Sequence, residues 1–98
     1  MNLMLMTEQQ RVLIETAERR DRAEALLASL EKARQQCEHE MTRAQRADVV
    51  KEVTGHSALD RAIHSTRRMI DTLEQAIRDA ARNLSLEDLE GIGLAHLA

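Results

Sequence analysis

The chain has 98 residues, contains no proline and no aromatic residue, and carries a formal net charge of -3 at pH 7. This length allows one domain, and the missing Phe, Tyr and Trp leave aliphatic side chains to build the core and none to stack on nucleic-acid bases. A charge this close to neutral provides no field that attracts nucleic acid or an anionic membrane, and no stretch approaches a membrane span, so both partners are disfavoured.

The composition is typical of long helices. Ala, Leu, Glu, Arg and Gln are abundant, and side chains of this kind lose little rotamer freedom in a helix. The expected fold is therefore all-α, without strands. Cys37 is the only cysteine, which excludes an intrachain disulfide and favours a reducing, cytoplasmic location.

Residues 1–6 are largely apolar but lack the basic flank and the length of a signal sequence, so we expect a flexible N-terminal arm. Thr7 followed by Gln10 has the spacing of a capping box, in which each side chain bonds the other residue's backbone N–H. No glycine or proline follows before Gly55. The sequence therefore predicts a first helix over about residues 8–53.

A hairpin tip is predicted at residues 54–57. Gly55 can adopt the left-handed conformation that ends a helix, and Ser57 with Asp60 can cap the start of the next helix. Residues 7–84 are therefore expected to form one long antiparallel helical hairpin, similar to a coiled coil.

The second helix, expected over residues 58–84, carries the clearest pattern in the sequence. Apolar residues recur at alternating steps of four and three, which is typical of a coiled-coil seam. Ala62, Met69 and Ala76 lie beside this seam and widen it into a face that suits a bundle of more than two helices. The oligomer interface predicted on this face consists of Leu59, Ile63, Met69, Ile70, Leu73, Ile77 and Leu84.

The first helix has a weaker, alanine-rich seam, with Leu26 and Ala33 beside it. Folding back at the predicted tip places Met41 opposite Ile70 and leaves much of the second helix uncovered. We expect a homodimer that forms a four-helix bundle to cover this face, and its orientation, parallel or antiparallel, stays open. The same surface also suits a different polypeptide as partner.

Residues 85–98 are expected to form a short C-terminal helix or tail. Ser85 with Asp88 has the spacing of a second capping box, and a helix that begins there can double back over the apolar start of the first helix. Gly91 and Gly93 limit its length, because each glycine costs a helix about 1 kcal/mol.

The segment Leu86–Ala95 resembles the first helix and the Gly-Ile-Gly turn of the helix-hairpin-helix DNA-binding motif. In that family the backbone amides of the turn hold a phosphate, and a second helix begins there. Here the sequence after the turn is too short for that second helix. Glu87, Asp88 and Glu90 also surround the turn with negative charge, which opposes phosphate binding.

No catalytic, cofactor-binding or metal site is expected. Cys37 and His39 are residue types that bind metals, but residues two apart on a helix point in very different directions, so these side chains diverge. No nucleophile, base and orienting group can be grouped by their spacing. The candidate docking surface for an acidic partner is an outward stripe on the second helix, formed by Arg61, Arg68, Arg78 and Arg82.

These observations favour a non-enzymatic helical oligomerisation or adaptor protein that acts through protein-protein contacts. One alternative is a helical chaperone or a secretion-type component, whose apolar face covers a partner polypeptide. Another is a weak nucleic-acid-binding protein that uses the arginine stripe, although the charge balance makes nucleic acid an unfavourable partner.

Overall fold

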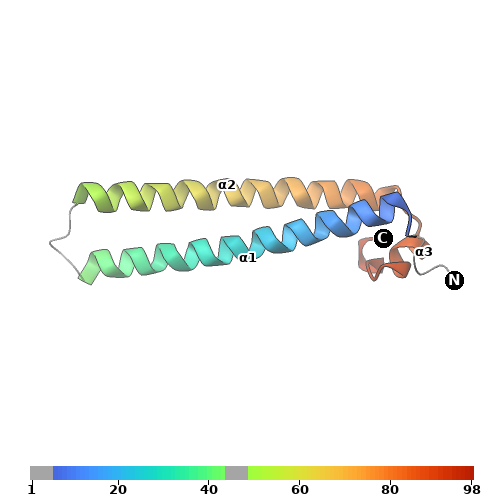
Figure 1. Cartoon of the computed structure of the whole chain (residues 1–98), viewed down its shortest axis with the longest axis horizontal. Coiled ribbons are helices and arrows are strands. Elements are labelled where there is room, and N and C mark those ends of the chain that lie inside the picture. Colours follow the sequence, from blue (N-terminus) through green and yellow to red (C-terminus); the bar gives the residue numbers. More distant parts are fainter. Residues whose placement is uncertain (1–5, 44–48) are drawn as a thin grey trace. The chain divides into compact units, whose positions relative to one another are not determined.

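The structure is a computed structural model that describes the backbone over residues 6–43 and 49–98 and the side chains over 6–41 and 57–98. Within these residues it contains two long helices and two short helical segments, and no strand (Figure 1). The elements are α1 (Glu8–Arg43), α2 (Val49–Arg82), α3 (Leu86–Gly91) and a 3-10 turn, η2 (Ala95–Leu97). The predicted all-α fold of two long helices followed by a short C-terminal helix is confirmed.

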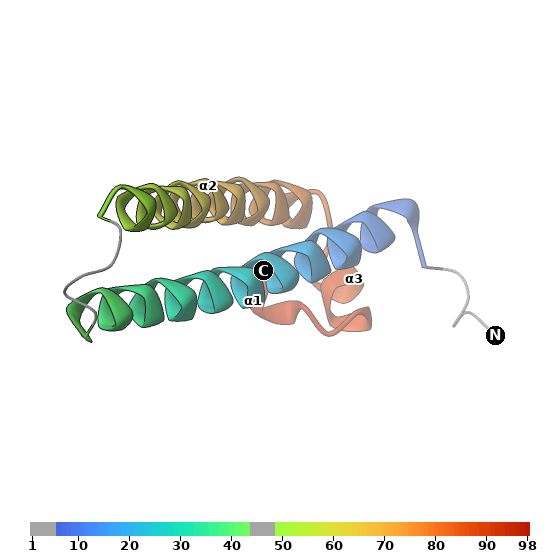
Figure 2. The same ribbon diagram turned by 60° about the vertical axis from the view of Figure 1, so that its left-hand side comes forward.

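Contacts group the chain into two compact units. The terminal unit comprises Met1–Arg22 and Ile70–Ala98, and the middle unit comprises Ala23–Met69. In each unit a segment of α1 packs beside a segment of α2 that runs in the opposite direction (Figure 2). Each unit therefore contains a pair of antiparallel helices, and the terminal unit contains α3 and η2 as well.

The predicted hairpin tip at residues 54–57 is wrong. The α2 helix begins at Val49 and continues through Gly55, so the connection between the long helices lies between Arg43 and Val49. A glycine permits a helix to end but does not compel it, since its cost inside a helix is only about 1 kcal/mol. Each residue that extends an existing helix adds a backbone hydrogen bond, which can offset a cost of this size.

The position of the tip changes which residues of the two helices lie opposite each other. In the middle unit Arg34 reaches Asp60, with 2.8 Å between Nε and Oδ1, and Arg67 reaches Glu31, with 3.0 Å between Nη2 and Oε1. The predicted tip would instead have placed residue 34 opposite residue 77. The expected pairing of Met41 with Ile70 is wrong for the same reason.

The terminal unit has a compact core around Leu13, which is 0% exposed. Leu13 of α1 packs with Ile77 and Ala81 of α2 and with Leu89 of α3, which is 1% exposed. Partly buried apolar residues surround this cluster: Ala17, Ala80, Leu84, Ile92, Leu94 and Leu97. Three helices thus share one core at this end of the chain.

Two of the three predicted caps are present, whereas Ser57 and Asp60 lie inside α2 and begin no helix. The Gln10 backbone N–H donates to Thr7 Oγ1 at 3.1 Å, and the Thr7 N–H donates to Gln10 Oε1 at 2.9 Å. At the start of α3 the Asp88 N–H donates to Ser85 Oγ at 3.1 Å, and the Ser85 N–H donates to Asp88 Oδ2 at 3.4 Å. Local side-chain chemistry therefore sets where these two helices begin.

The expected folding back of α3 over the start of the first helix is also confirmed, although the reason differs. The predicted tip made the first helix much longer than the second, but α1 and α2 have nearly equal lengths of 36 and 34 residues. The third helix instead covers one side of a helix pair that is already formed. Gln10 stabilises this contact, because its Nε2 donates to the Asp88 carbonyl oxygen at 2.9 Å.

Of the predicted N-terminal arm, Met6 is exposed and residues 1–5 lie outside the described residues.

Candidate functional site

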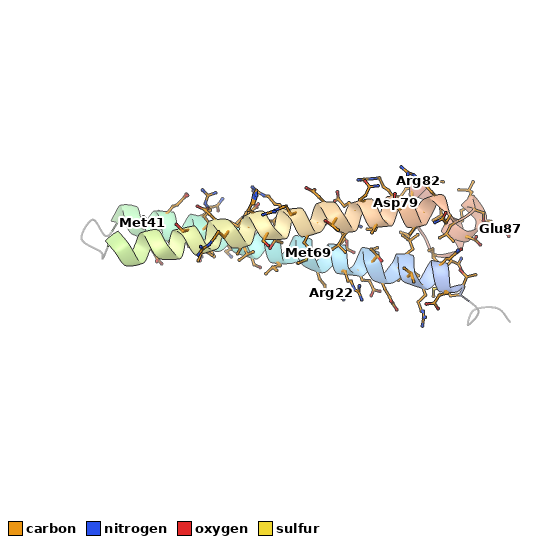
Figure 3. All side chains as sticks on the ribbon, turned by 90° about the horizontal axis from the view of Figure 1, so that it is seen from above. Arg22, Met41, Met69, Asp79, Arg82 and Glu87 are labelled. Carbon is orange, nitrogen blue, oxygen red and sulfur yellow. The ribbon has the colours of Figure 1, made fainter. Side chains whose placement is uncertain are left out.

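The predicted oligomer interface is largely the internal seam of the helix pairs. Ile63, Ile70 and Ile77 are buried within a single chain. Leu59, Leu73 and Leu84 are half-buried. Met69, which is labelled in Figure 3, differs from these six residues, because the residue is 52% exposed. The second helix therefore offers a much narrower free face than the sequence suggested, since α1 covers the isoleucines.

Thr66 interrupts the isoleucine seam and is buried as well. Its hydroxyl donates to the Ala62 carbonyl oxygen at 2.7 Å, within the same helix. A buried hydroxyl without a partner would cost about 1–3 kcal/mol. Because this bond is internal to α2, the seam needs no polar group from α1 or from a second chain at this position.

One side of the middle unit is closed by charged side chains. The ion pairs of Arg67 with Glu31 and of Arg34 with Asp60 bridge α1 and α2 there. Arg34 Nε also lies 3.5 Å from Oε1 of Glu38, one turn further along α1. We call these five residues the charged flank. By heptad spacing Arg34 lies on the α1 seam, and its long side chain lets the charge reach this side.

The opposite side of the middle unit is apolar. Successive helical residues are about 100° apart, so Leu26 and Glu31 fall on opposite sides of the α1 seam, and Met69 and Arg67 on opposite sides of the α2 seam. Because Glu31 and Arg67 touch each other, Leu26 and Met69 must share the other flank. Leu26 is 49% exposed and Met69 is 52% exposed.

Two alanines continue this apolar side. Ala33 stands one heptad after Leu26 on α1, and Ala62 one heptad before Met69 on α2, and both alanines are half-buried. The register of the ion pairs puts Leu26 level with Met69, and Ala33 level with Ala62, to within about one residue. We call Leu26, Ala33, Ala62 and Met69 the apolar flank.

Small, uncharged residues lie beside the middle of the apolar flank, while Arg22, one turn before Leu26, and Glu40, one heptad after Ala33, border it along α1. Ser29 lies beside it on α1, and Ala58 and Ser65 lie beside it on α2. The charged residues that bridge the middle unit are on the other flank. A second helix pair can therefore cover the apolar flank without placing a charged residue at its centre, where desolvating a charge would be costly.

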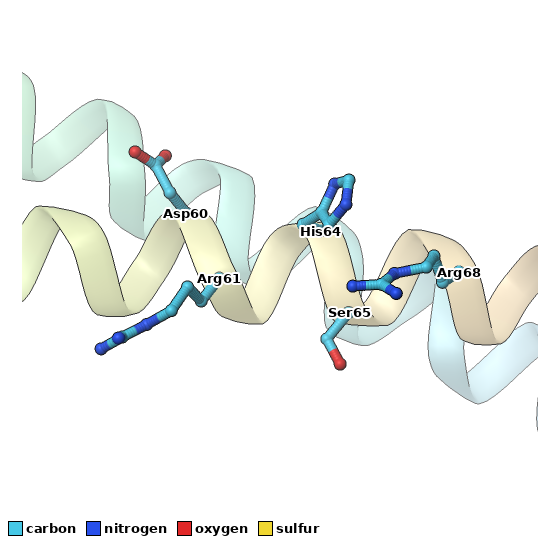
Figure 4. Close-up of a pocket in the computed structure, with 5 residues that line it drawn as sticks. All are labelled: Asp60, Arg61, His64, Ser65 and Arg68. Carbon is cyan, nitrogen blue, oxygen red and sulfur yellow. The ribbon is translucent and has the colours of Figure 1, made fainter.

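The arginine stripe is exposed, as predicted, but its members do not converge on one site. Arg61 and Arg68 line a shallow hollow on α2 together with Asp60, His64 and Ser65 (Figure 4). Asp60 adds a negative charge to that hollow and is already paired with Arg34.

The other two arginines of the stripe, Arg78 and Arg82, belong to the terminal unit. Arg78 Nη2 donates to Gln75 Oε1 at 2.8 Å, and Arg82 Nη1 lies 3.5 Å from Asp79 Oδ1. Both partners are on α2 itself, so these contacts support an exposed helix rather than forming a prepared site for an anion.

The turn after α3 does not offer its amides to a phosphate. Gly93 has a φ of 75°, which suits a glycine in a tight turn. The amides of Ile92 and Leu94 donate to the Leu89 carbonyl oxygen at 3.3 and 2.8 Å, and the Gly93 amide donates to the Glu90 carbonyl oxygen at 3.1 Å. The donors that would bind a phosphate in a helix-hairpin-helix turn are thus used within the chain.

The described residues contain no group of three or more His, Cys, Asp or Glu side chains placed to hold a metal ion. Cys37 is a free, half-buried thiol. Glu8 bonds Arg11 at the start of α1 and raises the pKa of that guanidinium, with a smaller contribution from the charge of Glu15. Arg11 therefore stays protonated and offers no acid-base chemistry near neutral pH.

Comparison with known protein families, with curated proteins and with solved structures finds no match to this chain. In the part of the chain that the structure describes, none of the helices has the length and apolar character needed to cross a membrane. Function must therefore follow from the surfaces of the two units. Sequence reasoning assigned Met69 to an interface and placed Leu26 beside the seam, but it had no signal for the flank that they share.

Proposed function

We propose that this chain is a non-enzymatic helical oligomerisation protein, and that its apolar flank packs against a second copy to form a four-helix bundle. The observation that carries this proposal is the exposure of Leu26 and Met69, about half of each residue, on the same side of the middle unit. Fully burying a Leu or Met side chain contributes about 1.5–3 kcal/mol. Burying the exposed half contributes roughly 1 kcal/mol for each, and two copies bring four such side chains together.

Identical chains suit this surface because it carries no charge that would repel its own copy. Two-fold symmetric dimers bury the same patch on both subunits, so the patch must be compatible with itself. The charged flank is a poorer surface for a second copy, because packing against it would remove its carboxylates and guanidiniums from water. An adaptor role follows naturally, because dimerisation leaves the outer surface of α2 available to another protein.

The proposal is tested by sedimentation equilibrium of the full chain. We expect a dimer mass for the wild-type protein, and loss of the dimer in Leu26→Glu and Met69→Glu, each of which places a carboxylate in the interface. The matched control is Leu86→Glu, because Leu86 is 54% exposed but lies on α3 in the terminal unit. This control should keep the dimer mass.

A monomeric wild-type chain that unfolds cooperatively would overturn the proposal. Retention of the dimer in both glutamate variants would move the interface to another surface. A stable complex with a different, purified polypeptide that competes with dimerisation and is lost in Leu26→Glu would replace homodimerisation with the chaperone-like alternative.

A further inference from the structure

We infer that the second copy packs on the middle unit in the antiparallel orientation, with the Leu26 side chain of one copy over Ala33 of the other and Met69 over Ala62. This inference rests on the proposed dimer and adds its orientation. It derives from the distribution of large and small side chains over the apolar flank, which is not uniform.

The apolar flank has a bulky level and a small level. Leu26 and Met69 lie opposite each other at one level, and both protrude into solvent by about half of their surface. Ala33 and Ala62 lie opposite each other one heptad away, about 10.5 Å along the helix axes. The surface therefore rises at one level and is lower at the next.

Two symmetric ways of placing a copy face to face on this surface differ in what they bring together. A two-fold axis parallel to the helices stacks α1 on the partner's α2 and keeps levels in register, so Leu26 would meet Met69 of the partner subunit. The alanine levels would then also face each other. Bulky side chains would collide at one level while a gap remains at the other, and both conditions oppose close packing.

A two-fold axis perpendicular to the helices, and within the interface, gives the complementary arrangement. It stacks α1 on the partner's α1 and α2 on the partner's α2, each pair antiparallel, and it exchanges the two levels. Leu26 then fills the space over the partner's Ala33, and Met69 fills the space over the partner's Ala62. The axis passes between the levels, beside the small residues Ser29 and Ser65, where the helices can approach closely.

Disulfide trapping in the full chain separates the two arrangements. In a Cys37→Ser background, one protein carries Leu26→Cys and a second carries Ala33→Cys, and the two are mixed and oxidised slowly. A disulfide needs Cα atoms about 4.4–6.8 Å apart. We expect the mixed 26–33 disulfide to accumulate, whereas disulfides between two copies of the same variant should be absent because those positions are offset by about 10.5 Å along the axes.

Matched pairs extend the test to the second helix and to the rival arrangement. The mixture of Met69→Cys with Ala62→Cys should also cross-link, while Leu26→Cys with Met69→Cys should not. Mass spectrometry distinguishes the products, and the helix content and melting temperature of each variant exclude misfolding as the cause of a negative result.

The failures of the two proposals differ. A dimer mass together with the 26–69 disulfide would leave the proposed function intact and overturn the antiparallel orientation. A dimer mass with none of these disulfides would place the interface on another surface, and it would overturn the antiparallel orientation as well. A monomer mass for the Cys37→Ser protein and for the wild type would overturn the dimer itself.

Discussion

The terminal and middle units each contain a pair of amphipathic helices, and they differ in whether a third element of the chain covers the apolar residues beside the seam. A pair of amphipathic helices buries a seam but leaves apolar residues beside it exposed. In the terminal unit the chain covers one side with its own C-terminal segment, and Leu13 and Leu89 lose nearly all contact with solvent. In the middle unit Leu26 and Met69 stay about half exposed.

This difference shows that two helices of this composition are not enough to bury a wide apolar face. The α1 seam carries small residues such as Ala23 and Cys37 where the α2 seam carries isoleucines, and each missing methylene removes about 0.8 kcal/mol of burial. A third layer is required wherever larger residues lie beside the seam. The terminal unit has this layer within the chain, and the middle unit is proposed to obtain it from a second copy.

The largest effect is expected from removing the centre of the covered region. Leu13→Ala should destabilise the chain by about 2–5 kcal/mol, because a fully buried leucine leaves a cavity and loses its burial. Urea denaturation followed by circular dichroism measures this change. Val12→Ala is the neighbouring control, and it should cost less than about 1 kcal/mol because Val12 is 44% exposed. Equal effects at both positions would show that α3 does not protect Leu13 in solution.

A second prediction concerns the hydrogen bond between the Gln10 side chain of α1 and the Asp88 carbonyl oxygen of α3. Gln10→Glu keeps an acceptor for the Thr7 amide but loses the donor to the Asp88 carbonyl oxygen, so it should cost about 1–2 kcal/mol. Amide hydrogen exchange should become faster in α3, with a smaller change in the middle unit. Gln9→Glu is the control, because it adds the same charge at an exposed neighbouring position. The helix dipole stabilises a negative charge equally at both positions, since both lie in the first turn of α1. Equal exchange in the two variants would show that the bond is not formed.

A third prediction tests the beginning of α2, which belongs to the middle unit. Gly55→Ala should stabilise the protein by about 0.5–1 kcal/mol, because alanine is the better residue inside a helix. If Gly55 instead ended a helix at the hairpin tip expected from the sequence, Gly55→Ala would lower the stability, since alanine is strained in the left-handed conformation. Thermal melting decides between them. Ser57→Ala is a second probe, as it should be nearly neutral in a helix interior but cost about 1 kcal/mol at a helix start.

The smallest effect is expected at the charged flank. Removing the ion pair with Glu31→Gln or Arg67→Gln should cost at most about 1 kcal/mol, and less at high salt, because both side chains are well exposed to solvent. A double-mutant cycle isolates the interaction between them. Arg61→Gln is the control, because Arg61 is an exposed arginine of the same helix that lies outside the charged flank. A coupling energy near zero, at low salt, would mean that Glu31 and Arg67 are not held together and would weaken the assignment of the two flanks.

Several features of this fold follow from residues that are close in the sequence. The capping boxes at Thr7 and Ser85 set the starts of α1 and α3, because a cap needs only a side chain and a backbone amide three residues away. The heptad spacing of Ile63, Ile70 and Ile77 placed them correctly on a buried seam. Each signal acts within one element and depends little on its surroundings.

The tip, the register and the division into flanks were decided by the tertiary structure. Gly55 permits a break locally, but its cost inside a helix is only about 1 kcal/mol, and α2 continues through it from Val49. The alanine-rich seam of α1 matches α2 almost equally well in several registers, so the sequence pattern could not choose one. The register that the structure adopts is the one in which Arg34 contacts Asp60. Leu13 likewise packs with Leu89, far away in the sequence. Leu26 and Met69 acquire a common surface only after that choice, since side chains on different helices become neighbours through packing alone.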